Sequence, residues 1–358
     1  MAEPQVRYFL GANSPNGFYS LYDQLLDPKT AAAIYILKGG PGCGKSSLMR
    51  RVAQTLEAQG IACQYILCSG DPESLDAVLF PTLRAAIVDG TAPHVVEPKY
   101  PGVVEHYVNL GTCYDCGGLG DIRGEIIACM DGFKGCYTRA YRCLSAAGQL
   151  REDMRCALVT PGLNQKLARR AKGILSRELK KTGRGPGGST RRFLGAVTGG
   201  GQLCSFETVH ALCNRVYELS DSYGLADGLL QTLAEGAVAA GYDVVLCPDP
   251  MATTRLAHLL VPELSLAFVT GTHELPYDGQ PYRRIRLDAM ADPELLRRGR
   301  AKLRFSRKIS GVLMAEAVEA LGEAKAKHDG LEALYNPHVD FKKVYQMADA
   351  IAGALARA

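Results

Sequence analysis

Short apolar runs of strand length recur along the first third of the chain, with amphipathic stretches between them. Residues 45–59 carry Leu48, Val52 and Leu56 at the spacing of one helical face, and residues 73–79 fit a short helix. Strands that alternate with helices form parallel sheets covered by helices, so this pattern predicts an α/β fold with a parallel sheet. The predicted strands are residues 33–38, 62–67, 85–88 and 103–110.

Longer helical patterns follow this region. Residues 125–179 are mostly helical in pattern, which predicts two or three helices packed beside the preceding sheet. Residues 294–327 and 341–356 show a similar pattern further along the chain. Two helical tails are therefore expected.

The chain contains an internal repeat. Residues 7–12 (Arg-Tyr-Phe-Leu-Gly-Ala) return as residues 191–196 (Arg-Arg-Phe-Leu-Gly-Ala), and further similarities recur in the same order at offsets of 178 to 184 residues. Such self-similarity indicates a duplication. Residues 182–189 are rich in glycine, proline and serine, as linkers are. We therefore predict two homologous modules, residues 1–182 and residues 190–358, each with its own helical tail.

Length and composition narrow the class of protein. The chain has 358 residues, of which 47% are apolar and 22% charged, unlike disordered, collagen-like or coiled-coil chains. No apolar run reaches the roughly 18 residues of a membrane helix, and residues 1–10 lack the apolar core of a signal peptide. The twelve cysteines are scattered, as reduced thiols are. We expect a cytoplasmic protein with no membrane partner.

Positive charge is concentrated in two segments, although the net charge is only +4. Residues 164–192 contain ten lysines and arginines against one acid, and residues 283–308 contain ten against three acids. Such segments can attract phosphate or nucleic acid. Solvated helix faces have the same composition, and this second interpretation is the favoured one. Nucleic acid is therefore a possible partner that the sequence does not favour.

Residues 39–46 (Gly-Gly-Pro-Gly-Cys-Gly-Lys-Ser) fit the phosphate-loop pattern G-x-x-x-x-G-K-[ST], between a predicted strand and a predicted helix. Glycines let backbone amides surround a phosphate group, and the helix N-terminus adds partial positive charge. Lys45 is expected to reach the β- and γ-phosphates of ATP, and the Ser46 hydroxyl to bind Mg²⁺. The residues predicted to contact the nucleotide are Gly39, Gly40, Gly42, Cys43, Gly44, Lys45, Ser46 and Ser47.

Two aspartates are candidates for the acid that accompanies such a loop. Asp89 ends a predicted strand, where an acid helps to hold Mg²⁺ in phosphate-loop proteins. The alternative is a turn aspartate that begins the loop after the strand. Asp71 follows the second predicted strand and could orient a water molecule or an acceptor as a third catalytic residue. Its alternative is a turn or helix cap.

The second module lacks the charged groups of the loop. Aligning the two copies places Asp227 at the position of Lys45, Gly228 at that of Ser46 and Thr270 at that of Asp89. A carboxylate in place of the lysine repels phosphate. The second copy is therefore expected to fold like the first and to bind no ATP.

The chain resembles an uncharacterised bacterial family of tandem P-loop proteins, usually labelled ATPase or nucleotide kinase. The resemblance covers nearly the whole chain, and it implies two P-loop NTPase modules, ATP or GTP binding, and no particular substrate. The second module of that family often keeps a phosphate loop of its own, and this chain departs from the family there. The matching segments are residues 9–12, 39–46, 89–94, 98–102 and 328–341.

A looser likeness is to adenylate kinases. Residues 39–45 look like their loop, and Asp89-Gly90 followed by Pro93 is similar to their D-G-x-P-R element. His94 stands in place of the arginine of that element, and their arginine-rich lid is not evident. A likeness at this level is weak support for a substrate.

The favoured function is Mg²⁺-dependent binding and slow hydrolysis of ATP in the first module, coupled to a conformational change or to a protein partner. One alternative is a nucleotide or small-molecule kinase, whose acceptor the sequence does not identify. The other is a nucleotide sensor or scaffold that does not hydrolyse ATP.

Overall fold

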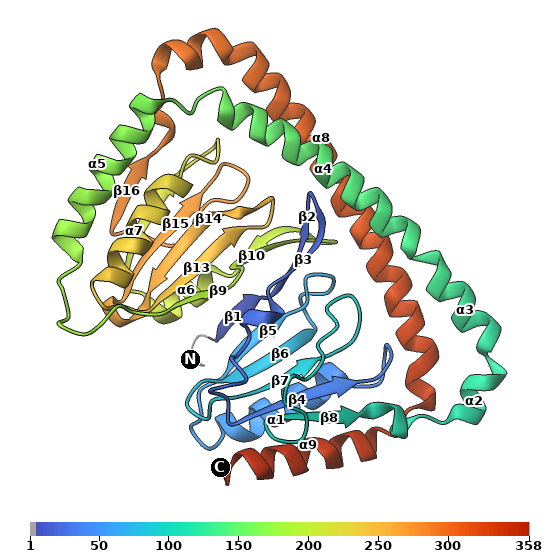
Figure 1. Ribbon diagram of the computed structural model, residues 1–358. Coiled ribbons are helices and arrows are strands. Elements are labelled where there is room, and N and C mark those ends of the chain that lie inside the picture. Colours follow the sequence, from blue (N-terminus) through green and yellow to red (C-terminus); the bar gives the residue numbers. More distant parts are fainter. Residues whose placement is uncertain (1–4, 358) are drawn as a thin grey trace.

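The computed structural model describes residues 5–357, which form two six-stranded sheets with helices on their faces (Figure 1). The sheets have equivalent strand orders and equivalent strand directions, which is consistent with duplicated α/β modules. The first sheet consists in order of β1 (Val6–Phe9), β5 (Gln64–Leu67), β6 (Leu75–Phe80), β7 (Ala85–Asp89), β4 (Ala33–Lys38) and β8 (Glu105–Asn109). The second consists of β16 (Arg283–Arg286), β12 (Arg215–Ser220), β15 (Leu266–Gly271), β14 (Ala252–Val261), β13 (Val244–Asp249) and β9 (Ser189–Arg191).

The prediction of parallel sheets is wrong for one strand in each sheet. β6 and β14 run antiparallel to both of their neighbours, and the remaining neighbours pair in parallel. β6 also replaces the short helix predicted over residues 73–79. All six of its residues are buried. A short apolar run that is buried on both faces has no period that separates strand from helix.

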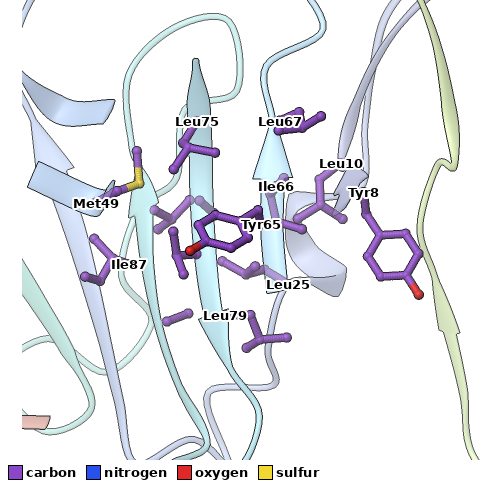
Figure 2. Close-up of a cluster of buried hydrophobic side chains, with 14 of the residues drawn as sticks. Tyr8, Leu10, Leu25, Met49, Tyr65, Ile66, Leu67, Leu75, Leu79 and Ile87 are labelled. Atoms are coloured by element: carbon purple, nitrogen blue, oxygen red, sulfur yellow. The ribbon is translucent and has the colours of Figure 1, made fainter. Parts of the chain in front are cut away.

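Helix α1 (Lys45–Glu57) covers the first sheet, and its apolar side confirms the predicted helical face. Met49 of α1 belongs to the same buried hydrophobic cluster as residues of β5, β6 and β7, among them Ile66, Leu75 and Ile87 (Figure 2). Helix α7 (Asp227–Ala239) holds the equivalent place on the second sheet, against β13 and β14.

Two long helices connect the sheets. α4 (Lys134–Cys156) packs along α8 (Pro293–Tyr335), and together they form one side of the molecule (Figure 1). A helix rises about 1.5 Å per residue, so the 23-residue helix α4 is about 35 Å long. The shorter helices α2 (Cys116–Asp121) and α3 (Arg123–Gly132) precede α4.

The last helix of each tail packs on the sheet of the other module. α5 (Pro161–Glu178) follows the first sheet in sequence, yet it packs against α7 in the core of the second sheet. α9 (Phe341–Leu355) follows the second sheet and packs against α1 in the core of the first. The expectation that each tail packs beside its own sheet is therefore wrong, because α4 and α8 carry the tails across.

The repeated segments meet each other. The backbone amide of Phe9 donates to the carbonyl of Phe193 (2.8 Å), and that of Phe193 donates to the carbonyl of Phe9 (2.9 Å). A contact between two equivalent segments uses the same surface twice, so similar residues serve in both copies. This symmetric contact gives a physical reason for the close similarity of residues 7–12 and 191–196.

The remaining elements are short. None of the helices in residues 5–357 is long and apolar enough to cross a membrane. The short elements are the hairpin strands β2 (Gly11–Ser14), β3 (Gly17–Ser20), β10 (Gly195–Thr198) and β11 (Gly201–Cys204), helix α6 (Phe206–Leu212), and the 3₁₀ helices η1 (Tyr22–Gln24), η2 (Leu110–Cys113), η3 (Pro262–Leu264), η4 (Asp288–Met290) and η5 (Asn336–His338).

Candidate functional site

A glycine-rich loop, Gly39–Gly44, connects β4 to α1. Gly42 and Gly44 have φ values of +66° and +85°, in the left-handed region that favours glycine. A Cβ at Gly39 would lie 2.6 Å from the Sγ of Cys43, so this position also requires glycine. Gly44 precedes α1 without a capping side chain. The first amides of α1 therefore lack the side-chain partner that many helices have.

Lys45 is the first residue of α1 and folds back over the loop. Its Nζ donates to the carbonyls of Gly39 (2.9 Å) and Gly40 (2.8 Å) and lies 3.6 Å from Oδ2 of Asp89. The side chains of Lys45 and Asp89 are 13% and 12% exposed. The structure thus places the lysine and the predicted partner acid together as a largely buried ion pair.

Ser46 and Asp89 lie at the same edge of the sheet. Asp89 ends β7 opposite Leu37 of the parallel strand β4, so both strands deliver their carboxyl ends here. The Oγ of Ser46 accepts a hydrogen bond from the amide of Leu75 (3.0 Å). Oδ1 of Asp89 accepts from the amide and hydroxyl of Thr91 (2.8 and 2.6 Å). Asp89 therefore makes the contacts of a turn aspartate and faces Lys45 with its other oxygen.

Cys43 and Ser47 differ in exposure. The thiol of Cys43 is buried beneath the loop, and this burial raises its pKa. Ser47 is exposed in the first turn of α1. Among residues 5–357, the backbone amides of Cys43 and Gly44 have no hydrogen-bond partner. These two amides are therefore available to an anion.

Asp71 lies in the turn between β5 and β6. Its Oδ2 accepts from the Ser74 hydroxyl (2.9 Å), and its Oδ1 lies 3.6 Å from Nζ of Lys325 on α8. Within the described residues, no hydrogen bond or ion pair joins Asp71 to Lys45 or Asp89. The structure places Lys45, Ser46 and Asp89 at the same edge of the sheet. Asp71 lies apart from them and makes the contacts of a turn residue.

The sequence reasoning missed a second buried acid, Asp76 of β6. Ala77 of β6 pairs with Val88 of β7, so continuing this antiparallel register sets Asp76 opposite Asp89. The hydroxyl of Tyr22 donates to Oδ2 of Asp76 (2.6 Å), and burial raises the pKa of the Asp76 carboxyl. An aspartate within the apolar residues 75–80 is the signal in the sequence, but the helix predicted over residues 73–79 does not place Asp76 beside Asp89.

His94 completes this buried polar cluster. Its ring stacks on Tyr22 with 4.4 Å between centroids, and its Nε2 lies 4.0 Å from Oδ1 of Asp76. Neither ring nitrogen has a hydrogen-bond partner among the residues that the structure describes. The cluster of Tyr22, Asp76 and His94 therefore lies directly beside the Lys45–Asp89 pair.

The C-terminal segment, residues 332–344, covers the loop from outside. A Cβ at Gly42 would lie 3.0 Å from the carbonyl oxygen of Glu332, and one at Gly44 would lie 3.1 Å from the ring of Phe341. The hydroxyl of Tyr114 accepts from the amide of Gly40 (2.8 Å). Because residues 113–115 pair with residues 338–340 through two backbone hydrogen bonds, Tyr114 links the loop to this segment.

The equivalent loop of the second sheet is residues 221–226, between β12 and α7. Gly224 has a φ of +70°, close to that of Gly42, and Asp227 begins α7 as Lys45 begins α1. The structure thus agrees with the sequence alignment at these positions. Oδ1 of Asp227, which aligns with Lys45, accepts from the amide of Leu256 on β14 (2.8 Å), much as the neighbouring residue Ser46 of the first loop accepts from the amide of Leu75 on β6.

Asp221 fills the second loop with its own carboxylate. Its oxygens accept from the amides of Leu225 (2.9 Å) and Ala226 (2.7 Å), and the amide of Tyr223 adds a third bond (3.2 Å). The alignment places Leu225 and Ala226 at the positions of Cys43 and Gly44. This loop geometry therefore binds an anionic group through its backbone amides. In the first loop, a glycine stands in place of Asp221.

Comparison with known protein families gives a match to part of the chain. A family model described as Nephrocystin 3, N-terminal, matches residues 19–86, which include the glycine-rich loop and α1. No curated protein and no solved structure matches the chain.

Proposed function

We propose that this chain is a Mg²⁺-dependent P-loop ATPase with one competent site, in its first module, and a degenerate copy in its second. The observation that carries the proposal is the pair of equivalent loops. One loop cradles the Asp221 carboxylate, and the other has free amides and a lysine at the start of its helix. Backbone amides at a helix N-terminus, together with a lysine, are the groups that bind nucleotide phosphates.

The residues of the first loop fit this role. The amides of Cys43 and Gly44 would donate to phosphate oxygens, and Lys45 would exchange the carbonyls of Gly39 and Gly40 for the β- and γ-phosphates. Ser46 and Asp89 would hold Mg²⁺. A bound Mg²⁺ neutralises charge on the phosphates.

The arrangement of acids supports hydrolysis as the proposed reaction. Asp89 is held in place by Thr91, and Asp76 provides a second buried carboxyl beside it. The C-terminal segment, which lies against Gly42 and Gly44, would shield the bound phosphates from bulk solvent. ATP is the expected nucleotide, and GTP is the alternative to compare in the same assay. The two α/β modules, whose sheets have equivalent strand orders, also support the resemblance to tandem P-loop proteins.

Product analysis tests the reaction type. Full-length protein is incubated with γ-labelled ATP and Mg²⁺, alone and with a panel of nucleotide and small-molecule acceptors. Release of free labelled phosphate without an acceptor is expected. A labelled acceptor would instead show a kinase, and binding without release of label would show a sensor. Absence of ATP binding would contradict the proposal as a whole.

Asp89→Asn should lower Mg²⁺-dependent phosphate release more than it lowers ATP affinity. The substitution removes the negative charge that would hold the metal and keeps the size and the Thr91 contacts of the side chain. Phosphate release and calorimetric binding are measured at several Mg²⁺ concentrations.

Asp71→Asn is the companion to that variant. Because Asp71 contacts Ser74 and Lys325 and not Lys45, we expect a much smaller change in turnover. Equal losses of turnover in the two variants would show that Asp71 also acts in the catalytic site. Unchanged turnover in Asp89→Asn would show that Asp89 does not hold Mg²⁺.

A further inference from the structure

Residues of α5 and β16 line a cationic hollow of about 630 Å³. These two elements lie at the second sheet, away from the glycine-rich loop (Figure 1). The lining of the hollow joins the two basic segments of the sequence, which are separated by residues 193–282. Residues 164–192 contribute one wall and residues 283–308 the other. The lining residues are Lys166, Arg169, Arg170, Gly173, Ile174, Arg177, Ile285, Arg286 and Met290.

The geometry of α5 makes this surface concave. Residues 166, 170, 173 and 177 are spaced by three and four positions, so they lie along one face of the helix. Gly173 is in the middle of that face, and a Cβ there would meet nothing within 4 Å. The missing side chain leaves a gap between the cations, over a floor that includes the buried Ile174 and Ile285.

The positive charges of the hollow are largely uncompensated. Among residues 5–357, Lys166, Arg169, Arg170 and Arg286 form no ion pair, and no acid lines the hollow. The Nζ of Lys166 donates to the carbonyl of Met290 (3.1 Å). Of the cations that line the hollow, Arg177 alone pairs with a carboxylate of the described residues, that of Glu178. Like charges one helical turn apart repel each other, so an anion in the hollow would relieve this repulsion.

Shape distinguishes the hollow from the exposed helix face of α8. On α8, Arg297 and Arg298 pair with Glu294, and other exposed cations of that helix form no ion pair among residues 5–357. In the hollow, the cations come from two elements, α5 and β16, and surround a concave surface.

We propose that the hollow binds a small organic polyphosphate, such as the di- or triphosphate group of a nucleotide. Guanidinium groups match phosphate oxygens with paired donors, and three of the unpaired cations are arginines. The volume is in the range of small-ligand sites. The apolar floor of Ile174, Ile285 and Met290 can accept a ring system attached to the phosphates. This site is independent of the glycine-rich loop and of the function proposed for it.

The proposal is tested by calorimetric titration of inorganic tripolyphosphate into the full-length Lys45→Ala protein, in which the loop lacks its cation. One saturable site is expected. Arg170→Glu combined with Arg286→Glu should weaken binding at least tenfold. Gly173→Leu, which fills the hollow without changing its charge, should also weaken binding at least threefold. Thermal melting of each variant reports on folding.

The matched control carries Lys172→Glu and Arg283→Glu. These residues belong to the same two elements, are exposed and do not line the hollow, so the net charge changes equally. Affinity should stay within threefold. An equal loss in this control, or no binding of tripolyphosphate, would overturn the proposal. A labelled single-stranded 20-nucleotide DNA that binds where tripolyphosphate does not would also overturn it, in favour of a nucleic-acid surface.

Discussion

Lys45→Ala should weaken ATP binding to the full-length protein by about ten- to hundredfold, because a hydrogen bond between charged groups contributes about 1.5–3 kcal/mol. The ammonium group of Lys45 is the only side-chain cation paired with Asp89 among the described residues, and it begins the helix that the loop precedes. Calorimetric titration of Mg²⁺-ATP should show one site per chain in the unmodified protein and a strongly weakened site in the variant.

The stoichiometry also tests the second loop. Asp221 already occupies its amides, and Asp227 presents a carboxylate where a phosphate would need a cation. Lys180→Ala, at an exposed position, is the control and should leave binding unchanged. Two sites in the unmodified protein, or one tight site that survives in Lys45→Ala, would show that the second loop binds ATP.

Leu167→Ala should destabilise the second sheet, although Leu167 belongs to the first half of the chain. Leu167 of α5 is buried in the same core as α7, β14 and β15. Truncating a buried leucine to alanine costs about 2–5 kcal/mol. Hydrogen exchange under native conditions should therefore accelerate in β12, β14 and β15 more than in β4 and β7.

Lys172→Ala is the control on the same helix, because Lys172 is exposed and forms no ion pair among residues 5–357. Its exchange pattern should match that of the unmodified protein. If Leu167→Ala instead accelerated exchange in β4 and β7, with the second sheet unchanged, the packing of α5 on the second sheet would be wrong.

Local sequence patterns predicted the elements around the loop well. Residues 33–38 form β4 as expected, and the helix predicted from residue 45 begins there. Both depend on short-range signals: an apolar run, three spaced leucine and valine residues, and a glycine-rich turn. β6 was missed because residues 75–80 are buried on both faces, which removes the alternation that marks a strand.

Contacts between distant parts of the chain were not predictable in the same way. Nothing in the spacing of residues 341–356 indicates which sheet they cover, since an amphipathic helix only requires some apolar surface. The role of Asp221 was hidden for a similar reason. Its position in the alignment is that of a glycine, and only the hydrogen bonds to Leu225 and Ala226 show that its carboxylate fills the loop.

The C-terminal segment has a consequence for the order in which the protein can mature. Chains are synthesised from the N-terminus, and early parts begin to fold before later parts emerge from the ribosome. The glycine-rich loop is synthesised long before Glu332 and Phe341, the residues that enclose it. Phe341 is the first residue of α9, so the helix that completes the core beside α1 is also synthesised after the loop. A nascent chain therefore carries an open, incompletely packed loop until residues 332–355 have been synthesised and have packed against it.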